Sequence, residues 1–211
     1  MHPQTPGTHW PWSYLTWPNR ISMLRLLLIP PFVMLMLHQR GNEGFRRLAM
    51  GIFAVMAISD WLDGYLARRL KVASRLGAFL DPLADKALII CSAVLLSLPG
   101  SQVGDLRLPD WVVVMIVGKD LWVIIGSVVV FMIAGRLKIS PTIWGKLCTD
   151  GQLAMVFAFL LSPELDKLRA GLGFSIAHVL WWVVAALCAL AVVSYTRLGI
   201  AFLAEHEAGH K

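Results

Sequence analysis

Charged side chains are scarce in this sequence. They make up 15% of the 211 residues, whereas hydrophobic residues make up 57% and the mean hydropathy is +0.67. A water-soluble domain of this length would carry far more charge on its surface. The scarcity therefore excludes an ordinary soluble protein and indicates that lipid is the solvent of this chain.

Cysteine is also scarce, and the first 20 residues lack the features of a signal peptide. Cys91, Cys148 and Cys188 lie within or beside apolar stretches, with no CxxC motif and no histidine at metal-ligand spacing. We expect buried, inert thiols rather than a disulfide or a zinc site. The N-terminal stretch does not show a basic region followed by an apolar region and a cleavage site with small residues. Its Trp- and Pro-rich sequence suits a membrane interface instead.

Six apolar stretches, separated by proline, glycine or charged clusters, predict six membrane-spanning helices. Residues 174–196 run without an acidic or basic side chain, which suffices to cross roughly 30 Å of hydrocarbon. The other stretches are 21–38, 46–66, 78–98, 110–134 and 143–162. We therefore predict an all-α integral membrane protein, a bundle of six transmembrane helices. The predicted parts are an N-terminal interfacial segment (1–19), the six-helix domain (20–204) and a C-terminal tail (205–211).

Lysine and arginine are divided unevenly between the two sides of this predicted bundle. Eleven lie on the side of both termini and the 68–77 loop, and six lie on the other. Basic residues accumulate on the cytoplasmic side of membrane proteins, so the termini and this loop are predicted to be cytoplasmic. The net charge of +6 suits anionic lipid headgroups, and nothing in the sequence indicates nucleic acid.

Acidic side chains occur where a membrane span should exclude them. Asp60, Asp63, Gly64, Ala67 and Arg68 lie at i, i+3, i+4, i+7 and i+8, which is one face of a helix. Each acid inside a span costs at least about 2.5–3.5 kcal/mol, which favours a functional reason for it. A single acid could instead be an interfacial residue paired with lysine or arginine.

The next predicted helix repeats the pattern with Gly77, Asp81 and Asp85 at i, i+4 and i+8. Two antiparallel helices joined by a short loop can then direct four carboxylates into one pocket. Arg68 and Lys86 could neutralise part of this charge, and carboxylate oxygens bind hard divalent cations best. All four acids in phase, together with small residues, predict a site for two metal ions.

This segment resembles the signature of the CDP-alcohol phosphotransferase family, D-x2-D-G-x2-A-R-x(variable)-G-x3-D-x3-D. All eight fixed positions are present between Asp60 and Asp85. Residues 18–25, PNRISMLR, are similar to the P-N-x2-[ST]-x2-R that opens the first span in many members. The resemblance implies a metal-dependent CDP-alcohol phosphatidyltransferase, which moves a phosphatidyl group from CDP-diacylglycerol to an alcohol and releases CMP. It also implies a homodimer in the bacterial cytoplasmic (inner) membrane, with the active site facing the cytoplasm.

The resemblance implies a role for each matched residue. Asp60, Asp63, Asp81 and Asp85 would hold two divalent cations, Mg²⁺ or Mn²⁺, and Asp85 would also be the base that deprotonates the alcohol. Such transfer depends mainly on positioning and charge neutralisation, which carboxylates and bound cations can provide. The positions matched to binding of the CDP-lipid are Asn19, Asp63, Gly64, Ala67, Arg68, Ser74 and Gly77.

The sequence leaves more than one acceptor alcohol open. Residues 18–30 and 60–86 closely resemble the phosphatidylglycerophosphate synthase branch, whose acceptor is glycerol 3-phosphate. Residues 118–120, Gly-Lys-Asp, look more like the cardiolipin synthase branch, which uses phosphatidylglycerol. Cations that could meet an anionic acceptor, or simply anchor the helices, are Arg136, Lys138 and Lys146.

Three further interpretations follow from the polar residues of the spans. Intramembrane acids also mark ion pathways, so a cation transporter is the non-enzymatic alternative. Lys119 and Asp120 are adjacent and should point apart on a helix, so each is expected to need another partner. His178 has no histidine or cysteine at ligand spacing and is expected to be packed and hydrogen-bonded rather than catalytic.

Overall fold

The computed structural model is all-helical in the part of the chain that it describes. It describes the backbone of residues 17–70, 75–134 and 142–208, and the side chains of 23–60, 83–133 and 142–204. The six apolar stretches each become one helix, so the all-α prediction is confirmed. The helices are α1 (Trp17–His38), α2 (Glu43–Leu70), α3 (Arg75–Ser97), α4 (Asp110–Ala134), α5 (Ile143–Leu168) and α6 (Leu172–Ala208).

Three helices continue past the ends that the sequence predicted, α2 by one turn to Leu70 and α5 and α6 by more. α5 runs through Pro163, which has no N–H to donate to the carbonyl of Phe159. The Ser162 hydroxyl donates to that carbonyl at 2.8 Å, so the acceptor stays satisfied and the helix continues. α6 passes 196 and ends at Ala208, because the residues between are mostly strong helix formers.

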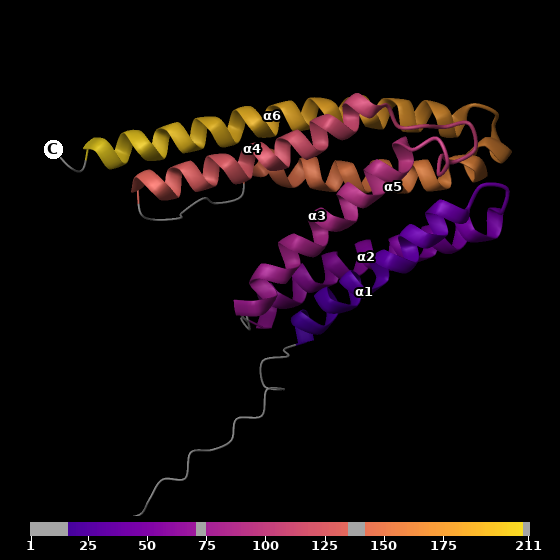
Figure 1. Cartoon of the computed structure of the whole chain (residues 1–211), viewed down its shortest axis with the longest axis horizontal. Coiled ribbons are helices and arrows are strands. Elements are labelled where there is room, and N and C mark those ends of the chain that lie inside the picture. Colours follow the sequence, from indigo (N-terminus) through magenta and orange to yellow (C-terminus); the bar gives the residue numbers. More distant parts are fainter. Residues whose placement is uncertain (1–16, 71–74, 135–141, 209–211) are drawn as a thin grey trace, which may run out of the picture.

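The helices form two groups of three (Figure 1). α4 and α5 pack along α6, while α1 packs against α2 and α3 and crosses the first group obliquely. The groups lie close at the end that carries the α1–α2 and α5–α6 turns, and they spread apart at the other end. Contacts of α5 with α2 and α3, and of α3 with α4, join the groups.

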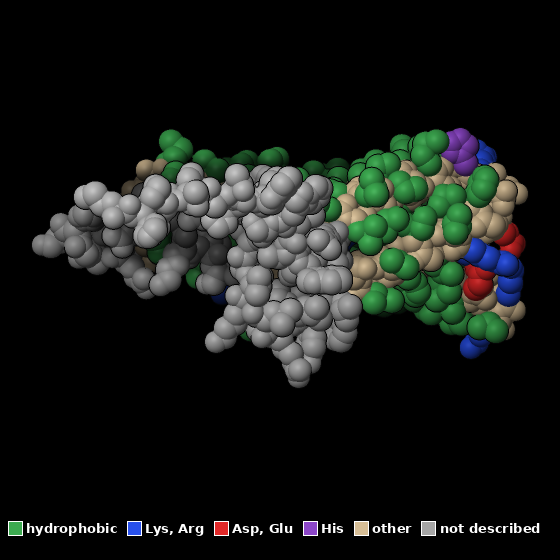
Figure 2. Space-filling model, turned by 90° about the horizontal axis from the view of Figure 1, so that it is seen from below, with side chains coloured by type: hydrophobic (Ala, Val, Ile, Leu, Met, Phe, Trp, Pro, Cys, Tyr) green, Lys and Arg blue, Asp and Glu red, His purple; other side chains and the backbone are tan. Residues whose placement is uncertain are grey.

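The end where the groups meet is tied by ion pairs. The buried Arg46 of α2 lies 2.6 Å from Glu164 of α5 and also donates to the carbonyl of Leu160 at 2.7 Å. This hydrogen-bonded guanidinium holds the pKa of Glu164 below its usual range. Glu43 and Lys167 add an exposed pair at 3.1 Å. Figure 2 shows charged side chains gathered at this end, with apolar side chains covering the described surface beside it.

The turn between α5 and α6 brings their backbones very close. Gly171 adopts a φ of 77°, a left-handed conformation that glycine accepts at little cost. A Cβ on Gly173 would lie 2.4 Å from the carbonyl oxygen of Ser162, so only glycine fits there. This close approach sets the pairing of α5 with α6, which extends along both helices.

Within the described residues, two helices are long and apolar enough to cross a membrane. By length and composition they are Asp110–Ile133 of α4 and Leu172–Ala204 of α6, and Met23–His38 of α1 is a shorter apolar helix. α2 and α3 carry the aspartates and basic residues that lower their apolar character. α2 and α3, which carry the predicted site, are not among the two span candidates, and neither is α5.

Candidate active site

Three helices bring one arginine and two aspartates together. Arg25 of α1 is almost fully buried, with 1% of its side chain exposed. Its Nη1 atom lies 2.9 Å from Asp60 Oδ1 on α2 and also donates a hydrogen bond to Asp85 Oδ1 on α3. The two carboxylates, 36% and 31% exposed, therefore converge on one nitrogen atom from two helices.

A narrow pocket surrounds this contact. Besides the three charged residues, it is lined by apolar side chains of α2 and α3 and by Thr149 and Leu153 of α5. Apolar walls exclude water, and charge interactions are stronger where water is excluded. The pocket therefore combines two hard oxygen donors, one fixed positive charge and a neighbouring hydroxyl. The apolar lining residues are Met56, Ala57, Leu88 and Ile89.

Apart from Ser74, the remaining predicted site residues lie on the same helices, but their side chains are outside the described part of the chain. Asn19 is in α1, and the backbone of α2 is helical through Leu70, as the spacing of its motif requires. Ser74 lies wholly outside the described residues. In α2 these residues are Asp63, Gly64, Ala67 and Arg68, and in α3 they are Gly77 and Asp81. Among the side chains that the structure describes, no three potential metal ligands cluster.

The expected role of Lys86 as a counter-charge of the aspartates needs correction. Lys86 follows Asp85 directly, so it points about 100° away around α3 and reaches α4 instead. There its Nζ atom contacts Asp120 Oδ1. Arg25 supplies the counter-charge of Asp60 and Asp85. Arg25 is the last residue of the PNRISMLR stretch, which the sequence analysis had matched to the family. That match did not indicate that Arg25 contacts the aspartates.

Lys119 and Asp120 form a polar cluster with Lys86 between α3 and α4. Lys119 and Asp120 are buried, with side chains 4% and 8% exposed, and Lys119 Nζ lies 2.9 Å from Asp120 Oδ1. The sequence predicted that Lys119 and Asp120 point apart and that each needs another partner. This is wrong for their contact with each other, because the long Lys119 side chain folds back far enough to reach Asp120. Asp120 does have a second partner, Lys86. Two cations and one anion leave the cluster with a net positive charge.

Two other polar groups agree with their predictions. His178 accepts a hydrogen bond from Trp182 Nε1 at 3.2 Å and packs against the rings of Phe174 and Trp181. It is packed and hydrogen-bonded, as expected. The three cysteines are free thiols as expected, Cys148 and Cys188 are buried and Cys91 is half-buried, whereas their expected inertness is untested.

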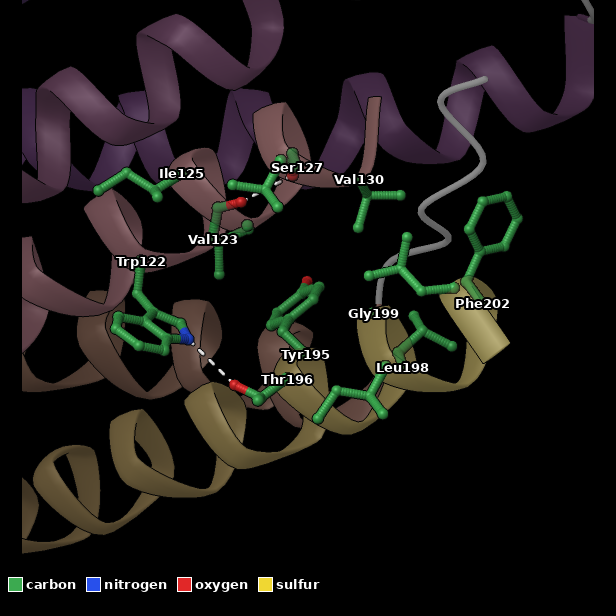
Figure 3. A pocket seen from close by; sticks show the side chains of 14 residues that line it. Trp122, Val123, Ile125, Ser127, Val130, Tyr195, Thr196, Leu198, Gly199 and Phe202 are labelled. Carbon is green, nitrogen blue, oxygen red and sulfur yellow. Dashed lines mark hydrogen bonds between the residues drawn. The ribbon is translucent and has the colours of Figure 1, made fainter. Parts of the chain in front are cut away.

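A larger cavity of about 330 Å³ lies between α4 and α6 (Figure 3). Its walls are mostly apolar, and none of the described residues that line it is acidic or basic. Trp122 Nε1 donates to Thr196 Oγ1 at 3.0 Å within this wall, which satisfies both polar groups. The cavity has the character of a lipid-facing groove, and the convergent charges of Arg25, Asp60 and Asp85 lie elsewhere.

The helices that carry these charges also carry the match to a known family. The family model described as CDP-alcohol phosphatidyltransferase matches residues 15–193, which span α1 to α5 and most of α6. The chain belongs to the CDP-alcohol phosphatidyltransferase family. The predicted resemblance is therefore confirmed, and α2 and α3 are the helices that carry the signature of this family.

The chain is similar to several bacterial proteins whose names state an activity. A Mycobacterium tuberculosis (strain H37Rv) protein named "Probable phosphatidylglycerophosphate synthase" is 37% identical over 145 residues, 68% of this chain and 65% of that protein. The match thus spans slightly under two thirds of that relative's length. The CDP-diacylglycerol–glycerol-3-phosphate 3-phosphatidyltransferase of Bacillus subtilis (strain 168) is 33% identical over 176 residues, 79% of this chain and 86% of the relative. A Mycobacterium bovis protein provisionally named as a cardiolipin synthase is 31% identical over 177 residues, 83% of this chain and 79% of the relative.

Removing the charge of Arg25 is expected to destabilise this family member. In Arg25→Gln the two carboxylates would face each other without their cation, at a cost of about 1–3 kcal/mol. The cost stays below the 3–5 kcal/mol typical of a fully buried broken pair, because both carboxylates are about one-third exposed. Thermal unfolding in detergent with chelator would measure the change.

Two variants serve as controls for Arg25→Gln. Arg25→Lys keeps the charge and should lose less stability than Arg25→Gln. Arg47→Gln removes an exposed arginine whose ion pairs should contribute less than about 1 kcal/mol. Equal loss in all three variants would contradict a specific role for the Arg25 charge.

Proposed function

We propose that this chain is a membrane enzyme that transfers the phosphatidyl group of CDP-diacylglycerol to glycerol 3-phosphate and releases CMP. The observation that carries the proposal is the convergence of Asp60 and Asp85 on Arg25, between the two helices that bear the family signature. The names of the Bacillus subtilis and Mycobacterium tuberculosis relatives support this choice of donor and acceptor.

All six helices are proposed to cross the membrane, with the site near its cytoplasmic face. The distribution of lysine and arginine supports this orientation. Figure 1 supports it too, because α2, α4 and α6 all end on the side away from the α1–α2 and α5–α6 turns. A bacterial cytoplasmic membrane is the proposed location. The homodimer implied by the resemblance stays a prediction.

The carboxylates of the site are proposed to hold two divalent cations, Mg²⁺ or Mn²⁺. Asp60 and Asp85 fit this role, since their hard oxygen atoms already converge on one positive group, Arg25 Nη1. Asp63 and Asp81 complete the proposed set of ligands. When bound, the cations would neutralise the diphosphate and favour departure of CMP.

The remaining steps are proposed for the chain's own residues. Arg25 holds the Asp85 carboxylate in place, so that Asp85 can take the proton of the attacking hydroxyl. The apolar pocket walls keep water from competing with the acceptor alcohol. The proposed binding residues for the CDP-lipid remain Asn19, Asp63, Gly64, Ala67, Arg68, Ser74 and Gly77.

The net positive cluster between α3 and α4 favours an anionic acceptor. Lys86 faces α4 rather than the Asp85 pocket, and its side chain is 41% exposed, so the cluster can meet an anionic phosphate group at the edge of the site. The same contact would suit phosphatidylglycerol, which also carries a phosphate. The Mycobacterium bovis relative and the Gly-Lys-Asp stretch at 118–120 make cardiolipin synthesis the second candidate.

The test is to identify the lipid product made from each acceptor. Purified protein in liposomes would receive CDP-diacylglycerol with glycerol 3-phosphate, phosphatidylglycerol, serine or inositol phosphate, in parallel. We expect CMP release and phosphatidylglycerophosphate at least about tenfold faster than any other product, a difference of 1.4 kcal/mol in the barrier. Cardiolipin as the main product would support the second candidate. Cation flux without CMP release would instead support a transporter.

A further inference from the structure

Two cysteines that are far apart in the sequence touch each other inside the helix bundle. The sulfur atoms of Cys148 on α5 and Cys188 on α6 are 3.4 Å apart, and the residues are 0% and 1% exposed. A disulfide needs a sulfur–sulfur distance of about 2.05 Å, so a shift of little more than 1 Å would allow the bond. The third cysteine, Cys91, lies on α3.

Polar side chains lie beside Cys148 and Cys188, so the two thiols are not packed by hydrocarbon alone. The side-chain amide of Gln152 donates to Cys188 Sγ at 3.5 Å. The buried Lys119 ammonium interacts electrostatically with both sulfur atoms.

We propose that Cys148 and Cys188 form a redox-active pair that closes to a disulfide when a lipid-soluble hydroperoxide enters the bundle. Because both thiols are buried among membrane-type helices, bulky water-soluble oxidants cannot reach them. A small apolar hydroperoxide, or one carried on an acyl chain, concentrates in the surrounding lipid and reaches the thiols when α5 and α6 part locally. This inference concerns a modification site and does not depend on the proposed transferase activity.

The chemistry balances in two steps. The Cys148 sulfur attacks the terminal oxygen of the hydroperoxide and the O–O bond breaks. The alcohol leaves with the thiol proton, and Cys148 becomes a sulfenic acid. The Cys188 thiol then attacks the Cys148 sulfur, and the departing hydroxide takes the Cys188 proton and leaves as water. Two thiols and one hydroperoxide thus give one disulfide, one alcohol and one water.

The position of Cys148 links this pair to the candidate active site. Thr149, the next residue of α5, lines the pocket of Arg25, Asp60 and Asp85. Drawing α5 toward α6 at Cys148 would therefore move one wall of that pocket. Any resulting change in transfer rate rests on the proposed function, whereas formation of the disulfide does not.

The test counts free thiols in the full chain before and after oxidation. Detergent-solubilised protein would be treated with cumene hydroperoxide, denatured, alkylated with N-ethylmaleimide and weighed intact. We expect the three free thiols of the wild type to fall to one, with recovery after dithiothreitol. Cys91→Ser should fall from two to none. Peptide mapping should show Cys148 joined to Cys188, and oxidised glutathione at equal concentration should leave all three thiols free.

Three results would overturn the proposal. They are a wild type that keeps three alkylatable thiols, a bond that includes Cys91, and oxidation of Cys148 to sulfinic acid without a bond. Cys188→Ser provides a positive control, because Cys148 should then stop at a sulfenic acid that dimedone traps. The decisive readout uses the wild type and needs no variant to fold. Loss of transferase activity in every condition would contradict the proposed function and leave this test intact.

Discussion

Asp85→Asn is expected to lose nearly all phosphatidyl transfer while it still binds the CDP-lipid. Asparagine keeps the shape of the side chain and one oxygen that can accept from Arg25, so the contact between α1 and α3 should survive. It cannot take up a proton at neutral pH. A base of this kind contributes about 10²–10⁴-fold to the rate, and the loss should fall mainly on kcat.

The measurement is the initial rate of CMP release at saturating divalent cation, together with binding of labelled CDP-diacylglycerol. Saturating cation separates loss of the base from weaker metal binding. Asp105→Asn is the matched control, because Asp105 is an exposed aspartate in the α3–α4 connection and should keep full activity. If Asp85→Asn retained more than about a tenth of the wild-type kcat, a loss of only about 1.4 kcal/mol, another group would have to accept the proton.

The six helices could be predicted from the sequence because each depends on local information. Apolar runs of span length, interrupted by polar clusters, indicate helices wherever they pack. The ends were harder. At Pro163 the sequence contains a helix breaker, but the Ser162 hydroxyl that replaces the missing donor acts only in the folded helix. The predicted end at 162 therefore differs from the observed end at Leu168.

The convergence of Asp60 and Asp85 could also be predicted, because helical spacing places them on faces that can meet. Their partner could not be predicted. Arg25 is on another helix, and a repeat within α2 or α3 says nothing about the angle at which α1 packs against them. The sequence indicated Arg68 and Lys86 as cations that could neutralise the aspartates, but Lys86 contacts Asp120 of α4 instead.

The contact between Cys148 and Cys188 shows the same limit at longer range. Nothing in the spacing of two cysteines on separate spans indicates that their sulfur atoms touch. The register of α5 against α6 depends on the close approach of Gly173 to Ser162, a tertiary contact between backbones. Sequence patterns identify which residues share a helix face, whereas packing decides which faces meet.

Removing divalent cations is expected to stop transfer completely. The four carboxylates proposed for this site, of which Asp60 and Asp85 meet at Arg25, would repel one another, and the charge of Arg25 would offset only part of that repulsion. Without cations, the diphosphate of the CDP-lipid would add further negative charge to the same pocket. Excess EDTA should therefore reduce CMP release to background, and Mg²⁺ or Mn²⁺ added beyond the chelator should restore it.

Asp60→Asn separates this requirement from a general need for salt. The variant lacks one proposed charged ligand, so it should need a higher Mg²⁺ concentration for any activity, whereas Asp105→Asn should titrate like the wild type. Cation binding should also stabilise the folded wild type, by about 2.7 kcal/mol at 100 times the Kd, visible as a raised Tm. Asp60→Asn should show a smaller rise. Full turnover by the wild type in excess chelator, with no change in Tm when Mg²⁺ is added, would rule out a metal role for these carboxylates. Arg25 and the pocket walls would then have to stabilise the transferred group alone.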